Sequence, residues 1–266
     1  MRASLEITKS NGVATVTLNR PEKHNAFDDA VIDELTSVFE DIDSDDSIRV
    51  MILAANGKNF SAGADLAWMK RMATYSYEDN LRDARGLAKM LSTLNRLSKP
   101  TIARVQGAAF GGAVGLVSCC DIAVATPNAS FALSEVKIGL IPATISPYVV
   151  RAIGERAARR YFVSAERFDA KQAHHIGLVS EIRGEAELDA YIVDLANTIK
   201  NNSPSAVTAA KKLALDVGTS EINDDLIEDT CKRIAQIRAS NDGQEGLTAF
   251  LDKRAPAWIN DINEKN

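Results

Sequence analysis

Residues 101–143 constrain the fold of this chain more than any other stretch of its sequence. The segment opens at 101–105 with apolar and β-branched residues, which are typical of a buried strand, and then breaks at a glycine-containing turn. Residues 113–119 have the composition of a short apolar helix. A helix that starts at a turn presents unpaired amides and the positive end of its dipole there. We therefore expect this turn to receive an oxygen atom that is becoming negative.

Two interpretations of the glycines stay open at this point. Gly112 lets an oxygen approach the backbone closely, or it lets strand and helix pack tightly. The pattern has neither the Lys-Ser/Thr of a P-loop nor a dinucleotide fingerprint, so phosphate and NAD binding are not supported. Glu135 favours catalysis, because apolar neighbours would raise the pKa of its carboxyl group and suit it to acid–base work. A surface glutamate paired with Lys137 is the alternative.

Five motifs, at residues 19–26, 60–65, 107–112, 120–125 and 131–142, together resemble the crotonase (enoyl-CoA hydratase/isomerase) superfamily. The resemblance covers about residues 5–260 and keeps the family's order and spacing. It implies an α/β fold, a crotonase-like spiral of β-β-α units with a C-terminal helical trimerisation region. Residues 1–184 would form the spiral core with the acyl-CoA site, and residues 185–266 the oligomerisation region of a homotrimer or homohexamer.

The resemblance also implies roles for individual residues. The amides of Ala64 and Gly112 would hold the thioester oxygen as two oxyanion donors, and Glu135 would be the catalytic carboxylate. No cofactor is expected, because coenzyme A is part of the acyl-CoA substrate. The other residues implied to bind substrate are Lys23, Asn25, Ala26, Ala62, Asp65, Leu66, Gly111, Pro142, Thr144, Phe250 and Lys253. Of these, Phe250 and Lys253 would reach the coenzyme A of a neighbouring subunit.

The residues by themselves leave plainer interpretations open. Asn25 can close a turn, and Asp65 can cap the helix that is expected from about residue 66. Phe250 can belong to the core, and Lys253 can favour the dipole of a helix end.

The chain departs from the two-glutamate hydratases at Gly115, which stands where their first acid would be. Hydration needs a base for water and a proton for the α-carbon, whereas 3,2-isomerisation needs one carboxylate to carry a proton. Residues 108–116 and 140–150 nevertheless resemble bacterial hydratases of branched, carboxylated enoyl-CoAs such as 3-methylglutaconyl-CoA. We expect hydration with Glu135 alone. A single-glutamate isomerase and a non-catalytic acyl-CoA-binding protein are the alternatives.

A carboxylated substrate needs hydrogen-bond donors or a cation in its pocket. The sequence offers five candidates, which can equally be surface or packing residues: Lys70, Arg71, Thr144, Ser146 and Tyr148.

Composition argues against several other classes. A net charge of −5 without a basic cluster disfavours nucleic-acid binding, including an RNA-binding module. The three cysteines form no CxxC motif and the three histidines offer no metal site, which favours a reducing compartment and no metal. No apolar run approaches the ~18 residues of a membrane span, so a cytoplasmic protein is expected.

Hydrophobic periodicity predicts a helix-rich chain. Strands are expected at 5–8, 13–18, 48–53, 101–105 and 178–182. Helices are expected at 28–42, from about 66, and at 77–97, 113–119, 147–153, 155–163, 170–176, 185–200, 205–217, 221–238 and 243–253.

Overall fold

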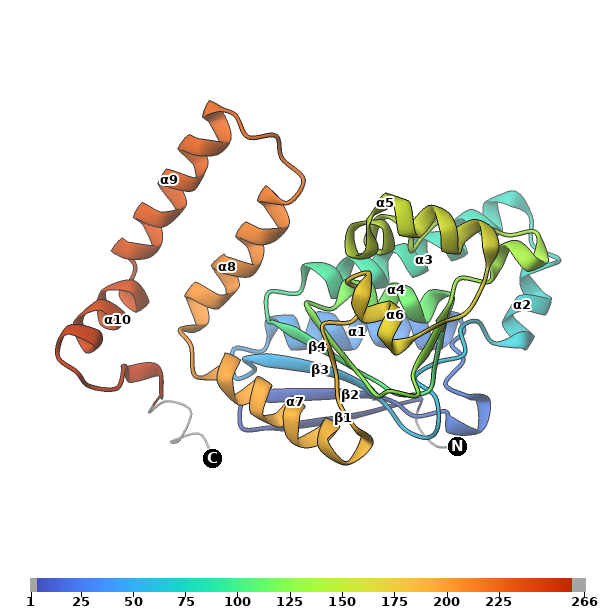
Figure 1. Ribbon diagram of the computed structural model, residues 1–266, viewed down its shortest axis with the longest axis horizontal. Coiled ribbons are helices and arrows are strands. Elements are labelled where there is room, and N and C mark those ends of the chain that lie inside the picture. Colours follow the sequence, from blue (N-terminus) through green and yellow to red (C-terminus); the bar gives the residue numbers. More distant parts are fainter. Residues whose placement is uncertain (1–3, 260–266) are drawn as a thin grey trace.

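A six-stranded sheet lies at the centre of the fold in the computed structural model, which describes residues 4–259 (Figure 1). Its strand order is β1-β2-β3-β4-β6-β9. The hairpin of β1 and β2 is antiparallel, and every further pair in this sheet is parallel. The strands are β1 (Leu5–Ser10), β2 (Val13–Leu18), β3 (Val50–Ala55), β4 (Thr101–Val105), β6 (Ile122–Ala125) and β9 (Glu181–Ile182).

A second, three-stranded sheet contains β5 (Ala108–Phe110), β7 (Ser130–Ala132) and β8 (Phe168–Asp169). After β4, and again after β6, the chain crosses from the large sheet to the small one and then turns towards a helix. This alternation is the expected spiral of β-β-α units. The sequence predicted no strand for any of the three, because two or three residues are too short to show a period.

Both faces of the large sheet are covered, and each cover forms its own core. In β3 all six side chains are buried: Met51 and Leu53 belong to the larger core, whereas Val50 and Ile52 face α7 (Glu185–Lys200). A continuous apolar run of this kind is what a strand buried on two sides requires.

Helices on the larger core pack on one another, with contacts from α1 to α3, α3 to α4 and α4 to α5 (Figure 1). They are α1 (Asp29–Ser44), α3 (Tyr77–Arg96), α4 (Gly112–Cys119) and α5 (Ser146–Ser164). Gly154 interrupts α5 with a φ of +75°, which accounts for the two helices expected there. The short elements are η1 (Pro21–Lys23), α2 (Leu66–Met72), η2 (Glu135–Ile138) and α6 (Ala170–His175).

The last three helices project from the body of the molecule (Figure 1). They are α8 (Pro204–Val217), α9 (Asp224–Ala239) and α10 (Asn241–Leu251), and neither α8 nor α9 contains a buried residue. The α9 helix starts three residues later than expected because Asn223 accepts a hydrogen bond from the amide of Leu226 as its cap. Because α7 packs on the sheet, the projecting part of the chain begins at Pro204. The division into two regions between residues 184 and 185 stays a prediction.

The helices within residues 4–259 include none that combines the length and the apolar character needed to cross a membrane.

Candidate active site

The turn after β5 and the loop after β7 meet at Gly111 and Glu135. Strands β5 and β7 are parallel and in register at Phe110 and Ala132, and the Gly111 amide donates to the Ala132 carbonyl at 2.8 Å. Gly111 has a φ of +55°, and a Cβ placed on it would lie 3.2 Å from Glu135 Oε1. The small sheet therefore holds the Glu135 carboxyl group directly over the backbone of the glycine turn.

The Glu135 carboxyl group is poorly solvated, and one of its two oxygen atoms has no hydrogen-bond partner among the described residues. This atom, Oε2, is buried. Burial raises the pKa of Glu135 above its ordinary value, against a smaller opposing effect of a backbone hydrogen bond. The expected rise is thus confirmed, and no ion pair between Glu135 and Lys137 is found in the described part of the chain. A carboxylate in this state is a ready proton acceptor.

Phe27 brings the amides of Ala64 and Gly112 to one place. The Phe27 amide donates to the Gly63 carbonyl at 2.9 Å, and the Asp65 amide donates to the Phe27 carbonyl at 3.0 Å. These two bonds lie on either side of Ala64 and leave its amide unused. The Phe27 ring lies against Gly112, where an added Cβ would come within 2.6 Å of the Phe27 Cζ atom. Gly112 is the first residue of α4, so its amide lacks an acceptor inside the helix.

Neither the Ala64 nor the Gly112 amide has an acceptor among the described residues. Sequence reasoning missed Phe27, although a large aromatic residue directly after the motif at 19–26 was a usable signal.

The loop before α2 is fixed onto β5. Ser61 and Ala109 form an isolated bridge, with hydrogen bonds from the Ser61 amide to Ala108 at 3.0 Å and from the Phe110 amide to Ser61 at 3.1 Å. Gly63 has a φ of +95°, and a Cβ there would lie 3.0 Å from the Phe110 carbonyl oxygen. This close approach needs glycine and fixes the position of Ala64.

The turn at residues 20–26 is tied to the neighbouring loop by Asn25. Its side chain accepts from the Arg20 amide at 2.8 Å and donates to the carbonyls of Asn56 and Asn59 at 2.8 and 2.9 Å. Asn25 does close a turn, as one interpretation expected, and it is buried. Because the side chain of Asn25 is satisfied internally, it holds the turn in place and is not free to bind a ligand.

Asp65 has the role of a helix cap, which confirms the plainer of the two interpretations. Its carboxylate accepts from the Ala67 amide at 2.8 Å and pairs with Arg20 at 3.0 Å and Lys23 at 3.2 Å. Burial opposes the charged form, but the Ala67 amide and the two cations outweigh it and hold the pKa of Asp65 below its ordinary value. Asp65 thereby links α2 to the turn at residues 20–26.

The remaining expected residues on this side of the molecule differ in exposure. Ala62 and Leu66 are exposed beside Ala64, Ala26 and Pro142 are buried, and Thr144 is half-buried. After Glu135 the chain exposes a run of apolar side chains, namely Val136, Ile138, Leu140 and Ile141.

The structure separates other expected residues from Glu135. Phe250 and Lys253 lie at the end of α10, on the opposite side of the molecule from α2 (Figure 1). Phe250 is 81% exposed, so it is not a core residue of this subunit. Gly115 lies one turn into α4, buried against Ile145.

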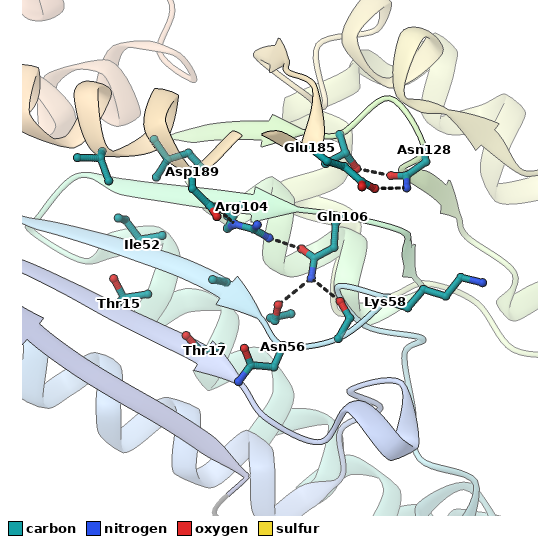
Figure 2. A pocket seen from close by; sticks show the side chains of 16 residues that line it. Thr15, Thr17, Ile52, Asn56, Lys58, Arg104, Gln106, Asn128, Glu185 and Asp189 are labelled. Carbon is teal, nitrogen blue, oxygen red and sulfur yellow. Dashed lines mark hydrogen bonds and ion pairs between the residues drawn. The ribbon is translucent and has the colours of Figure 1, made fainter. Parts of the chain in front are cut away.

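A polar cavity of about 660 Å³ lies elsewhere, between the large sheet and α7 (Figure 2). None of the expected site residues lines it. Arg104 pairs with Asp189 at 2.6 Å and donates to Gln106, which in turn donates to the backbone carbonyls of Ala55 and Gly57. These bonds connect α7 to the ends of β3 and β4, so the cavity's polar groups mainly hold the fold together.

Within residues 4–259, no three His, Cys, Asp or Glu side chains are grouped so as to hold a metal ion.

Comparisons with known proteins agree on one family. The enoyl-CoA hydratase/isomerase family model matches residues 8–261. The chain is 32% identical over 255 residues to the 2,3-dehydroadipyl-CoA hydratase of Escherichia coli, covering 96% of this chain and 98% of that one. It is 32% identical over 250 residues to the short-chain-enoyl-CoA hydratase of Clostridium acetobutylicum, covering 93% and 94%. A crystal structure of an enoyl-CoA hydratase from Shewanella pealeana superposes with a TM-score of 0.94 at 48% identity, covering 96% of both chains.

Proposed function

This chain belongs to the enoyl-CoA hydratase/isomerase family, and from that membership we propose that it adds water to a branched, carboxylated 2-enoyl-CoA such as 3-methylglutaconyl-CoA. Enoyl-CoA hydratase activity at the family level agrees with the names of its relatives. The observation that carries the proposal is the Glu135 carboxylate over the Gly111 turn, whose Oε2 atom is buried and has no partner among the described residues.

The two free amides account for activation of the thioester. With the thioester oxygen between the Ala64 and Gly112 amides, negative charge that develops on the oxygen meets dipoles already in place. One such donor is typically worth ~3–4 kcal/mol in the transition state. The Phe27 backbone and ring hold both amides at the site, so little reorganisation is needed when the charge develops.

Glu135 supplies both proton transfers. As a carboxylate it takes a proton from the water whose oxygen bonds to the β-carbon, and the electron pair of the double bond moves onto the thioester as an enolate. As a carboxylic acid it then returns that proton to the α-carbon, which restores the thioester. A raised pKa suits this double role, because it makes the carboxylate a stronger base towards the proton of the water.

The name of one relative supports a substrate whose acyl group ends in a carboxylate. The acyl group of a 2,3-dehydroadipyl-CoA ends in a carboxylate, so members of this family accept that chemistry. Lys70 and Thr144 are the candidate anchors, because no side-chain partner occupies either within the described residues. Arg71 pairs with Asp29, and the Ser146 hydroxyl donates to the Ala143 carbonyl. Tyr148 is hydrogen-bonded to Ser92 and borders Cys119, away from Glu135.

The missing acid at Gly115 keeps 3,2-isomerisation as a second candidate, because one carboxylate is enough to move a proton between carbons. Incubation in ¹⁸O-water with 2-enoyl and 3-enoyl thioesters separates the two reactions. Hydration puts label on the β-carbon, whereas isomerisation moves the double bond without label. Unlabelled migration as the dominant turnover contradicts the proposal, and binding without any turnover favours a non-catalytic acyl-CoA-binding protein.

The projecting helices support assembly into a homotrimer or homohexamer. Their exposed apolar side chains include Phe250 at 81% and Leu251 at 76% exposure. Phe250 and Lys253 are too remote to serve the Glu135 of their own chain, so they would complete the coenzyme A site of a neighbouring subunit.

A further inference from the structure

Gly115 has no room for any side chain. A Cβ placed on it would lie 2.3 Å from Ile145 Cγ2 and 2.9 Å from Ile145 Cβ, and 3.4 Å from Leu91 Cδ2. The first two distances are shorter than carbon atoms approach one another in proteins. The atoms that are met belong to the branch point of a β-branched side chain, which is stiff and cannot swing aside.

Ile145 is itself fixed. It is 2% exposed, and its carbonyl accepts from the amides of Tyr148 and Val149 in the first turn of α5. Neither its backbone nor its side chain can therefore move without disturbing the start of α5. Glycine at 115 and isoleucine at 145 are thus complementary in size, one filling the space that the other leaves.

The direction of α4 shows where a side chain at position 115 would point. Residues 112 and 115 are three apart and share a face of the helix. Helical side chains lean towards the N-terminus, so a long side chain at 115 would point back to the turn at Gly111 and Gly112. The Glu135 carboxyl group lies over that same turn.

We propose that Ile145 occupies the volume in which a carboxylate carried by residue 115 would stand, and that the Gly115–Ile145 pair makes Glu135 act alone. The inference rests on the proposed hydratase function and identifies Ile145 as a residue that decides how many acids the site contains. Replacing Ile145 by glycine and Gly115 by glutamate together should install a second acid beside Glu135. Either replacement by itself should not.

The packing half of the proposal is tested by thermal unfolding, which needs no substrate. Gly115→Ala should lower Tm by about 2–8 °C in the natural sequence, as overpacking does. In an Ile145→Gly background the same change should leave Tm unchanged or raise it. Gly86→Ala is the matched control, because Gly86 is also helical but has no atom within 4 Å of an added Cβ. A Gly115→Ala effect that is equal in both backgrounds overturns the inference.

The catalytic half is tested in a Glu135→Gln background. Gly115→Glu with Ile145→Gly should raise the residual ¹⁸O-water incorporation at the β-carbon by about 10-fold or more, because a second general base becomes available. Gly115→Glu without the second change should give no rescue and a lower Tm. A folded triple variant whose rate stays at that of Glu135→Gln overturns the inference. If the natural enzyme hydrates no thioester, the proposed function fails separately, since the Tm comparison still reports on the Gly115–Ile145 contact.

Discussion

Arg20 Nη2 lies 3.0 Å from Asp65 Oδ2, and this ion pair joins two loops that are 45 residues apart in the sequence. The Arg20 side chain is 14% exposed and that of Asp65 is 7% exposed. Because little water reaches either group, each charge is stabilised by the other. Because the same Asp65 caps α2, the pair fixes the turn at residues 20–26 relative to the Ala64 amide.

Asp65→Asn should destabilise the protein by about 2–4 kcal/mol, because it leaves the guanidinium of Arg20 buried with Asp28 as its remaining carboxylate partner. The loss should be measured as a lowered midpoint of urea unfolding, together with a raised KM for the acyl-CoA. Asp79→Asn is the control, since Asp79 also serves a helix start but is more exposed, and it should cost ~1 kcal/mol or less. Equal losses in the two variants would contradict the role given to Asp65.

Glu135→Gln should lower kcat for hydration by ~10²–10⁴, the usual effect of losing a general acid–base group. Binding of coenzyme A thioesters should change little, because the amide keeps the shape of the side chain. Steady-state kinetics and calorimetry measure the two quantities. Glu155→Gln, on an exposed part of α5, is the control and should leave both unchanged. A Glu135→Gln enzyme that retains more than a tenth of the natural kcat would refute the assignment.

The raised pKa of Glu135 predicts a pH-dependent stability difference. Between the ordinary and the raised pKa, the folded protein binds more protons at this site than the unfolded chain does, so the stability that Glu135 contributes falls as pH rises through this window. Glu135→Gln should therefore unfold at a higher Tm than the natural protein at pH 8, and the gap should shrink towards about pH 4. A gap that does not vary with pH would show that burial does not perturb this carboxyl group. In the same window kcat/KM should rise with pH, because the water must meet an ionised base.

Light scattering should give three or six times the 28.7 kDa mass of one chain. Ile227→Asp combined with Ile234→Asp should reduce this mass to that of a monomer, since the two side chains are exposed seven residues apart on one face of α9. Val193→Asp is the matched control, because Val193 is equally exposed on α7 but outside the projecting helices. A natural protein that scatters as a monomer would exclude assembly.

The sequence predicted long helices well and short strands poorly. The expected helix at 77–97 is α3 (Tyr77–Arg96), and that at 185–200 coincides with α7, because an apolar face that repeats over several turns is a local signal. The strands β5 and β7 have three residues each and are defined by the strands that they pair with. No window on the sequence contains that information.

The same limit applies to the candidate site. The Asp65 cap was predictable, because it depends on immediate neighbours in the chain. The raised pKa of Glu135 was predicted too, but its place over Gly111 depends on the pairing of β5 with β7. The contact of Gly115 with Ile145 and the ion pair of Arg20 with Asp65 join residues 30 and 45 positions apart, and depend on how helices and loops pack. The sequence indicated that an acid was missing at Gly115, but not that its space is filled.

The two amides without acceptors make the site observable in the absence of turnover. A backbone hydrogen that is bonded within a sheet or helix exchanges with deuterated solvent only when that structure opens, whereas the hydrogens of Ala64 and Gly112 have no such protection. They should therefore be labelled well before the amide hydrogens of Phe27 and Asp65, which are bonded to the carbonyls of Gly63 and Phe27. A thioester seated on them should slow their labelling, so deuterium uptake would report occupancy even by compounds that the enzyme cannot convert.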